Sequence, residues 1–100
     1  MNKTALDLIV EERQRQKEIE GWTPEHDNEH TDGSLATVAA CYAVAETLRE
    51  DFDTNDIMPD FWPESWDESW WKPSPDNRIK ELAKAGALIL AEIERLQRMA

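Results

Sequence analysis

Cysteine, glycine and long apolar runs are scarce in this sequence, and each scarcity excludes a class of protein. The single cysteine, Cys41, can form no disulfide within the chain, which excludes a secreted disulfide scaffold and predicts a reducing compartment. Only three glycines are present, and no glycine-rich phosphate loop is found among them. The longest apolar stretch, residues 85–91, is far shorter than the roughly 20 residues of a membrane-spanning helix. We therefore expect no membrane role, and the charged start of the chain predicts no signal peptide.

Basic residues are also few, and the negative excess is local. The chain has 11 basic and 22 acidic residues, a net charge of -11. Residues 21–75 hold 13 acidic and 2 basic groups, whereas residues 1–20 (5 and 4) and 76–100 (4 and 5) nearly balance. An acidic surface repels phosphate backbones and attracts basic surfaces. We expect no direct nucleic-acid binding and favour a basic protein surface as the partner.

The spacing of apolar residues predicts an all-α fold. Strand-like alternation is absent, and apolar residues recur at three- and four-residue steps in three places. A chain of 100 residues is expected to form a single helical domain. The prediction is a small three-helix bundle, with a long tryptophan-rich acidic loop and helices at about 5–20, 34–50 and 75–98.

Capping residues mark the expected helix starts. Thr4, with Asp7 three residues later, resembles a capping box, and Ser34 is the expected cap of the second helix. Ser74 followed by Pro75 predicts the start of the third. The apolar stripe of the third helix consists of Ile79, Leu82, Ala83, Gly86, Ile89, Leu90, Ile93 and Leu96. In a bundle, such a stripe normally faces the core.

Residues 22–33, expected to be a structured loop, concentrate groups that bind metals. His26 and His30 have a spacing seen in zinc sites, but no cysteine pair accompanies them. A solvated loop that caps the next helix is therefore favoured. Magnesium prefers carboxylates, and triphosphate hydrolysis needs several of them. The alternative metal set is Glu12, Glu25, Asp27 and His30. The competing interpretation of the first helix is a salt-bridged surface, because Arg13, Arg15 and Lys17 interleave with its acids.

The tryptophan-rich acidic stretch over residues 51–71 is the least ordinary part of the sequence. Some of its rings are expected to close the core, but core packing alone does not require the accompanying acids. Tryptophan is also enriched at the centres of protein interfaces, where acids match a partner's arginine or lysine. Core lid and interface stay open as equal alternatives. The candidate partner-binding residues are Asp51, Asp53, Asp56, Asp60, Glu64, Trp66, Asp67, Glu68 and Trp70.

Four stretches make the chain resemble a family of small phage and prophage proteins. They are Glu12–Gln16 (ERQRQ), Gly21–Asp27 (GWTPEHD), Trp70–Pro73 (WWKP) and Lys84–Leu96 (KAGALILAEIERL). Some members are described as remotely similar to MazG-like nucleotide pyrophosphohydrolases, all-helical enzymes that bind magnesium through carboxylates. The resemblance implies a magnesium-dependent enzyme with the polar site Glu12, Glu25, Asp27 and His30. Asn28 and Ser34 stand where the family pattern commonly has acids, which weakens the expected metal site.

The weakened metal set and the acidic stretch together favour binding over catalysis. Small acidic phage proteins often inhibit host defence, and some occupy a DNA-binding channel. We therefore expect a phage or mobile-element protein of the bacterial cytoplasm that binds the basic surface of a CRISPR effector complex and blocks target DNA, without a cofactor. The alternative is the magnesium-dependent pyrophosphohydrolase. The sequence does not fix the oligomeric state.

Overall fold

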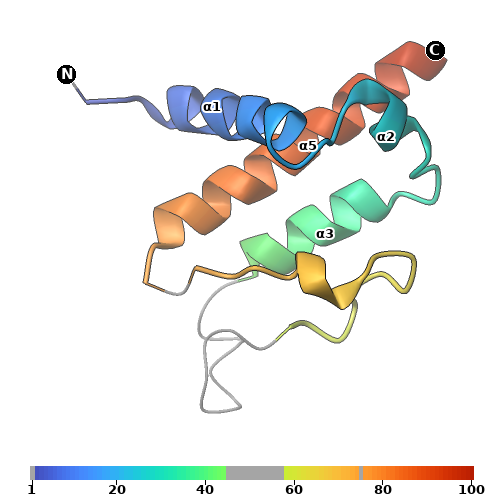
Figure 1. The fold of residues 1–100 in the computed structure, drawn as a ribbon. Helices are drawn as coiled ribbons and strands as arrows, with labels where there is room; N and C mark the ends of the chain where they lie inside the picture. The colour runs from blue at the N-terminus through green and yellow to red at the C-terminus, as the bar shows by residue number, and fades with distance from the viewer. Residues whose placement is uncertain (1, 45–57, 75) are drawn as a thin grey trace.

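The computed structural model describes residues 2–44, 58–74 and 76–100, and these residues form helices joined by irregular segments, with no strand (Figure 1). The elements are α1 (Ala5–Glu18), α2 (Pro24–Asn28), α3 (Ser34–Ala43), the short 3₁₀ helix η2 (Glu68–Trp70) and α5 (Arg78–Met99). The helix α5 is central, since α1, α2 and α3 all pack against it. The predicted all-α fold is confirmed. No helix in the described ranges has the length and apolarity to cross a membrane.

The capping box predicted at the start of α1 is present. The Asp7 backbone N–H donates to Thr4 Oγ1 over 3.1 Å, and the Thr4 backbone N–H donates to Asp7 Oδ2 over 3.0 Å. The two bonds satisfy N–H groups that lack partners in the first helical turn. The helix ends at Glu18, slightly before the predicted residue 20. Gly21 then reverses the chain with a φ of 75°, a left-handed conformation that glycine adopts readily.

The region before α3 differs from the prediction in two ways. The predicted loop contains the helix α2, which starts because Thr23 accepts a bond from the His26 N–H and Pro24 occupies the first position. The N-cap of α3 is Gly33, with a φ of 80°, and not Ser34. The Ser34 N–H donates to the neighbouring Asp32 carboxylate over 3.1 Å. The serine hydroxyl is thereby left for tertiary contacts.

The end of α3 at Ala43 corrects the predicted end at residue 50. Val44 leaves the helical conformation, with a ψ of 131°. Arg78 of α5 donates to the carbonyl oxygens of Tyr42 and Ala43 over 3.0 and 2.6 Å. These bonds replace helical partners that the last carbonyls lack. The remainder of the predicted helix, from residue 45, lies outside the described residues.

The start of α5 at Arg78 corrects the predicted start at residue 75. Asn77 is the N-cap, and its side chain accepts a bond from the Lys80 N–H over 3.1 Å. Ser74 donates its backbone N–H to the buried Glu81 carboxylate over 2.9 Å. Asn77, and not Ser74, therefore supplies the side-chain cap of α5.

The core lies between α3, α5 and the tryptophan-rich segment. Its buried members are Trp22, Leu35, Val38, Ala39, Cys41, Tyr42, Trp62, Trp66, Ala85, Leu88 and Ala91. Trp62 and Trp66 are only 8% and 5% exposed, so the segment that carries them is part of the core and no mere surface loop. Figure 1 shows this segment beneath α3, on the side away from α5. The indole rings supply much of the bulk that a chain of this size needs.

The face that α5 turns inward is not the predicted apolar stripe. Its buried residues are Glu81, Ala85, Ala87, Leu88, Ala91 and Arg95. Alanine side chains occupy little space, so α3 can lie close to α5. The stripe residues Ile79, Leu82, Ile89, Ile93 and Leu96 are instead 66, 46, 48, 48 and 52% exposed. The apolar spacing predicted the helix correctly but selected the wrong buried face.

Candidate functional site

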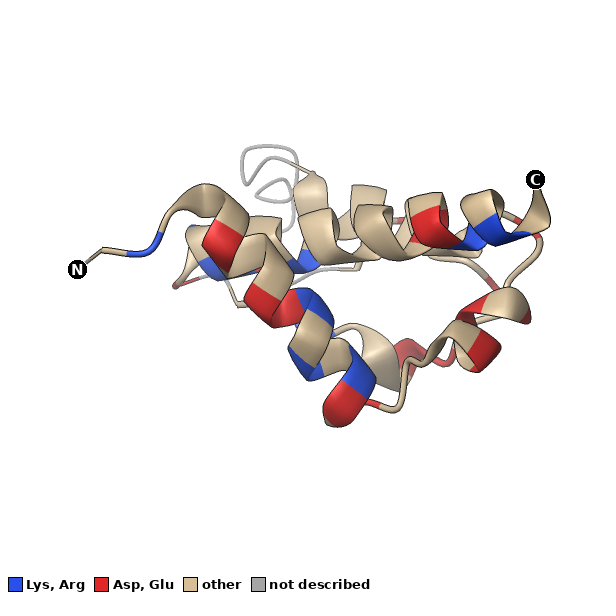
Figure 2. Cartoon of the chain, turned by 90° about the horizontal axis from the view of Figure 1, so that it is seen from above, with Lys and Arg blue, Asp and Glu red and all other residues tan. Residues whose placement is uncertain are grey.

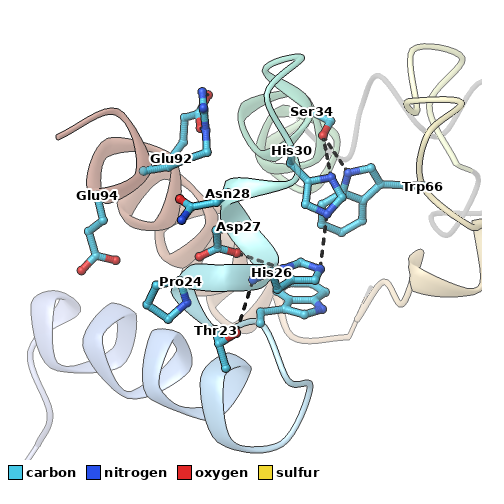
Figure 3. Close-up of polar contacts among 12 residues, drawn as sticks. Thr23, Pro24, His26, Asp27, Asn28, His30, Ser34, Trp66, Glu92 and Glu94 are labelled. Carbon is cyan, nitrogen blue, oxygen red and sulfur yellow. Dashed lines mark hydrogen bonds and ion pairs between the residues drawn. The ribbon is translucent and has the colours of Figure 1, made fainter. Parts of the chain in front are cut away.

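Asp27, a member of the alternative metal set, is a fully buried ion-pair partner. Arg13 donates from Nη2 to Asp27 Oδ2 over 2.8 Å, and from its other nitrogens to the Trp22 carbonyl oxygen and to Glu94. The second oxygen, Oδ1, lies 3.1 Å from His26 Nδ1 (Figure 3). Both Asp27 oxygens are therefore occupied inside the protein. The carboxylate joins α2 to α1, and through Arg13 to α5.

His26 and His30 form part of a half-buried hydrogen-bonded chain. Their Nε2 atoms lie 3.3 Å apart, so one nitrogen donates its proton to the other. His30 Nδ1 lies 3.2 Å from Ser34 Oγ, which also accepts a bond from Trp66 Nε1 over 2.9 Å (Figure 3). Burial lowers the pKa of His30, and a protonated His26 lowers this pKa further. The histidines thus link α2 and α3 to the tryptophan-rich segment.

The alternative metal set is not assembled in this structure. Glu12 lies on α1, Glu25 is exposed on α2, and Asp27 and His30 are held by the internal bonds above. In the described part of the chain, no three His, Cys, Asp or Glu side chains lie together as metal ligands. As they are placed in this structure, these residues do not fit a magnesium site.

The described part of the acidic stretch surrounds a hollow. Its acids Asp60, Glu64, Asp67 and Glu68 are exposed and line a cavity of about 550 Å³, together with Trp62 and Trp66. The structure gives Trp66 a core role, because its ring is nearly inaccessible and bonded to α3. Trp70 is half-buried against the core. The other candidates, Asp51, Asp53 and Asp56, lie outside the described residues.

A second cleft, which sequence reasoning missed, opens between α1, α5 and residues 70–74. It has a volume of about 430 Å³ and is lined by Glu12, Arg15, Gln16, Glu20, Trp22, Tyr42, Trp70, Lys72, Pro73, Ser74, Lys80, Lys84 and Leu88. Several of these residues belong to the ERQRQ and WWKP stretches. The concentration of charged and aromatic residues in these two stretches was a sequence signal for a site. That the two stretches meet in one cleft depends on how α1 and α5 cross.

The cleft is cationic although the whole chain is acidic. Four cations and two carboxylates line it, a balance of +2, whereas the chain carries -11. Figure 2 shows both acidic and basic positions along α1, the helix that forms one wall, with the basic ones in its second half. A local reversal of charge favours an anionic ligand over the cations that the rest of the surface attracts.

Arg15 forms ion pairs with both carboxylates of the cleft. Its Nε and Nη2 each donate to Glu12 over 2.8 Å, and its Nη1 donates to Glu20 over 3.0 Å. These bonds raise the pKa of Arg15, with the Glu12 hydrogen bond contributing most. Lys72 Nζ lies 3.7 Å from Glu20. Because both acids are already paired, the remaining positive charge of the cleft is available to a ligand.

Two lysines of the cleft lie over aromatic rings. Lys72 Nζ is 5.0 Å from the centre of the Trp70 ring, and Lys84 Nζ is 5.3 Å from the centre of the Tyr42 ring. Lys84 also donates to the Lys72 carbonyl oxygen over 2.7 Å. Burial lowers the pKa of Lys84, because removal from water disfavours the ammonium form. An anion beside Lys84 would raise this pKa, because it would stabilise the ammonium form.

Two buried polar atoms of the cleft residues lack a hydrogen-bond partner within the described part of the chain. They are Gln16 Oε1 and Trp22 Nε1, and the two residues are 1% and 6% exposed. An unpaired buried polar group costs about 1–3 kcal/mol. A ligand that offers an N–H donor to Gln16 and an acceptor to Trp22 would remove both costs.

Comparison with known proteins identifies no relative, since no protein-family model, curated protein or solved structure matches the chain. The resemblance to small phage proteins therefore stays a prediction.

Proposed function

We propose that the protein binds a nucleoside phosphate in the cleft between α1, α5 and residues 70–74. The observation that carries the proposal is the pair of unpaired buried atoms, Gln16 Oε1 and Trp22 Nε1, at a cationic cleft. A base with an exocyclic amino group carries both a donor and an acceptor, the two kinds of partner that Gln16 Oε1 and Trp22 Nε1 lack.

The charges and rings of the cleft support the same ligand class. Lys72, Lys80 and Lys84 suit the negative charge of a phosphate chain. The half-buried Trp70 ring also lines the cleft, beneath the Lys72 ammonium. The predicted resemblance to nucleotide pyrophosphohydrolases agrees with a nucleotide ligand. The proposal concerns binding, and hydrolysis is a separate activity.

Isothermal titration calorimetry tests the proposal with ATP, GTP and CTP, and with adenosine and inorganic triphosphate as the two halves of a nucleotide. A nucleotide is expected to bind more tightly than either half. Lys84→Met should weaken this binding about tenfold or more, since a charge-assisted hydrogen bond contributes about 1.5–3 kcal/mol. The matched control is Lys17→Met, because Lys17 lies on α1 outside the cleft lining.

Failure of all three nucleotides to bind would overturn the proposal. Equal loss of affinity in Lys84→Met and Lys17→Met would show that binding does not occur in the cleft. Release of pyrophosphate after magnesium is added to the same samples would establish the alternative enzymatic activity. That activity should then be reduced in Glu12→Gln, because Glu12 lines the cleft.

A second proposed function rests on the hollow of the acidic segment. We propose that its four exposed acids bind a basic protein surface, as in a phage inhibitor that covers the DNA-binding surface of a CRISPR effector complex. The hollow combines Asp60, Glu64, Asp67 and Glu68 with the wall formed by Trp62. A partner's arginine or lysine fits such a site, because the acids attract the cation and the ring contacts it.

Neutralising the four acids to Asn or Gln tests this second function. Affinity for a panel of purified CRISPR effector complexes should fall at least about tenfold, and the salt dependence of binding should decrease. The control neutralises four exposed acids elsewhere, Glu11, Glu18, Glu25 and Glu29. Equal affinity of the two variants would contradict a role for the hollow.

A further inference from the structure

The WWKP stretch forms one wall of the cleft, and side chains from other elements hold its backbone. Residues 70–74, the strap, run from the end of η2 toward α5 as an irregular trace beneath α3 (Figure 1). Irregular backbone lacks the regular hydrogen bonds of a helix, so its N–H and C=O groups need other partners. Three side chains of α3 and α5 bind backbone groups of the strap: Tyr42, Glu81 and Lys84.

Side chains alternate along the strap. The backbone at Trp71 is extended, with a φ of -75° and a ψ of 99°, so neighbouring side chains point to opposite sides. Trp70 and Lys72 line the cleft. The Trp71 ring instead packs against the rings of Tyr42 and Trp62, with centres 5.0 and 5.8 Å away. The strap therefore presents one indole and one cation to the cleft, and the residue between them anchors it to the core.

The Tyr42 hydroxyl binds the strap on both sides of Trp71. It donates to the Trp70 carbonyl oxygen over 2.7 Å and accepts from the Lys72 N–H over 2.9 Å. Burial raises the pKa of Tyr42 to about 12, so the hydroxyl keeps at neutral pH the proton that it donates. One hydroxyl thus holds the backbone of the two strap residues whose side chains line the cleft.

The strap is also tied to α5. Lys84 Nζ donates to the Lys72 carbonyl oxygen over 2.7 Å. The buried Glu81 carboxylate accepts from the Ser74 N–H over 2.9 Å. Both backbone groups of Lys72 are therefore held, the N–H from α3 and the C=O from α5. The Lys72 side chain starts from this fixed backbone and places its ammonium at the cleft, 3.7 Å from Glu20.

We propose that Tyr42 is a positioning residue of the cleft, whose hydroxyl holds Trp70 and Lys72 in place for the ligand. The inference rests on the proposed nucleotide binding. A wall that the protein itself holds need not be ordered by the ligand, so less conformational entropy is lost on binding and the affinity is higher. Because such coupling is reciprocal, a ligand in contact with the strap should also hold the strap more firmly.

Calorimetry with ATP, GTP and CTP, combined with amide hydrogen exchange, tests the proposal on the full chain. Tyr42→Phe keeps the ring against Trp71 and removes only the hydroxyl. Its affinity for a nucleotide that the native chain binds should fall about three- to tenfold, since two neutral hydrogen bonds to the strap are lost. Exchange at the Lys72 amide should become at least about tenfold faster, because this N–H loses its acceptor. Exchange in α5 should change less, which distinguishes a loose strap from a general loss of stability.

Ser34→Ala is the matched control. It removes another buried hydroxyl, which accepts from the Trp66 indole N–H and does not line the cleft. Nucleotide affinity and Lys72 exchange should stay near their native values in this variant. Circular dichroism shows whether each variant keeps its helices. If Tyr42→Phe fails to fold, the native chain decides, because bound nucleotide should slow exchange at Lys72 more than exchange in α3.

Native affinity or native Lys72 exchange in Tyr42→Phe overturns the positioning role and leaves the proposed function intact. Equal loss of affinity in Tyr42→Phe and Ser34→Ala overturns this role as well, since general destabilisation would then explain both. The same holds for a native chain whose bound nucleotide gives Lys72 no added protection. A native chain that binds no nucleotide overturns the proposed function itself, and this inference with it, before any variant is measured.

Discussion

At the scale of single residues, charged side chains occupy positions where a small core usually has apolar ones. Arg13, Asp27, Glu81 and Arg95 are 5, 0, 0 and 4% exposed. Each has an opposite charge in contact: Arg13 with Asp27, Glu81 with Arg78, and Arg95 with Glu92. Removal of one member of a buried pair leaves an uncompensated charge, which is far more costly than the loss of an exposed pair.

Asp27→Asn is expected to lower the free energy of unfolding by on the order of 3 kcal/mol, because the buried Arg13 would keep only the partly exposed Glu94 as an opposite charge. Urea unfolding followed by circular dichroism measures the change. Glu25→Gln is the control, since Glu25 is exposed on the same helix and its loss should change stability by less than about 0.5 kcal/mol. Similar losses in both variants would contradict a structural role for Asp27. Replacement of both pair members, Arg13→Met with Asp27→Leu, should recover part of the lost stability.

At the scale of secondary-structure elements, the crossing of α1 and α5 depends on a missing side chain. Alanine at position 86 would place a Cβ atom within 2.9 Å of Ile9 Cδ1. Glycine to alanine inside a helix normally stabilises a protein by about 1 kcal/mol. Here, we expect that gain to be cancelled by the contact. Gly86→Val should lower the free energy of unfolding by about 1–3 kcal/mol, because the larger side chain overpacks the crossing.

A double-mutant cycle between positions 9 and 86 checks the cause. Ile9→Ala alone should destabilise the native chain, and its cost should shrink in the Gly86→Val background, where space is needed. Urea unfolding of the four proteins gives the coupling energy. Additive effects would show that Ile9 does not limit the side chain at position 86.

At the scale of the whole molecule, three surfaces of different character occupy separate places. The cationic cleft lies between α1 and α5, the acidic hollow lies in residues 58–68, and the apolar stripe lies on the outer face of α5. Salt should weaken both nucleotide binding and basic-partner binding, because charges are screened.

Residue types alone identified candidate metal ligands, but they did not identify the role of those residues. Asp27 and His30 have the chemistry of metal ligands, but their role is decided by Arg13 and Ser34, which hold them inside the fold. The same local sequence permits either use. The cleft was missed because its unpaired atoms, on Gln16 and Trp22, become significant only when a tertiary structure buries them.

The sequence by itself determined the helical class, the capping box at Thr4 and the region of each long helix, because these depend on contacts between residues a few positions apart. The tertiary structure decided where α3 ends and α5 begins, since Arg78 and Glu81 bind distant backbone groups. It also decided which face of α5 is buried. The spacing of apolar residues predicts that a helix has an apolar face. Which face of that helix is buried, and against which other element, depends on packing between elements.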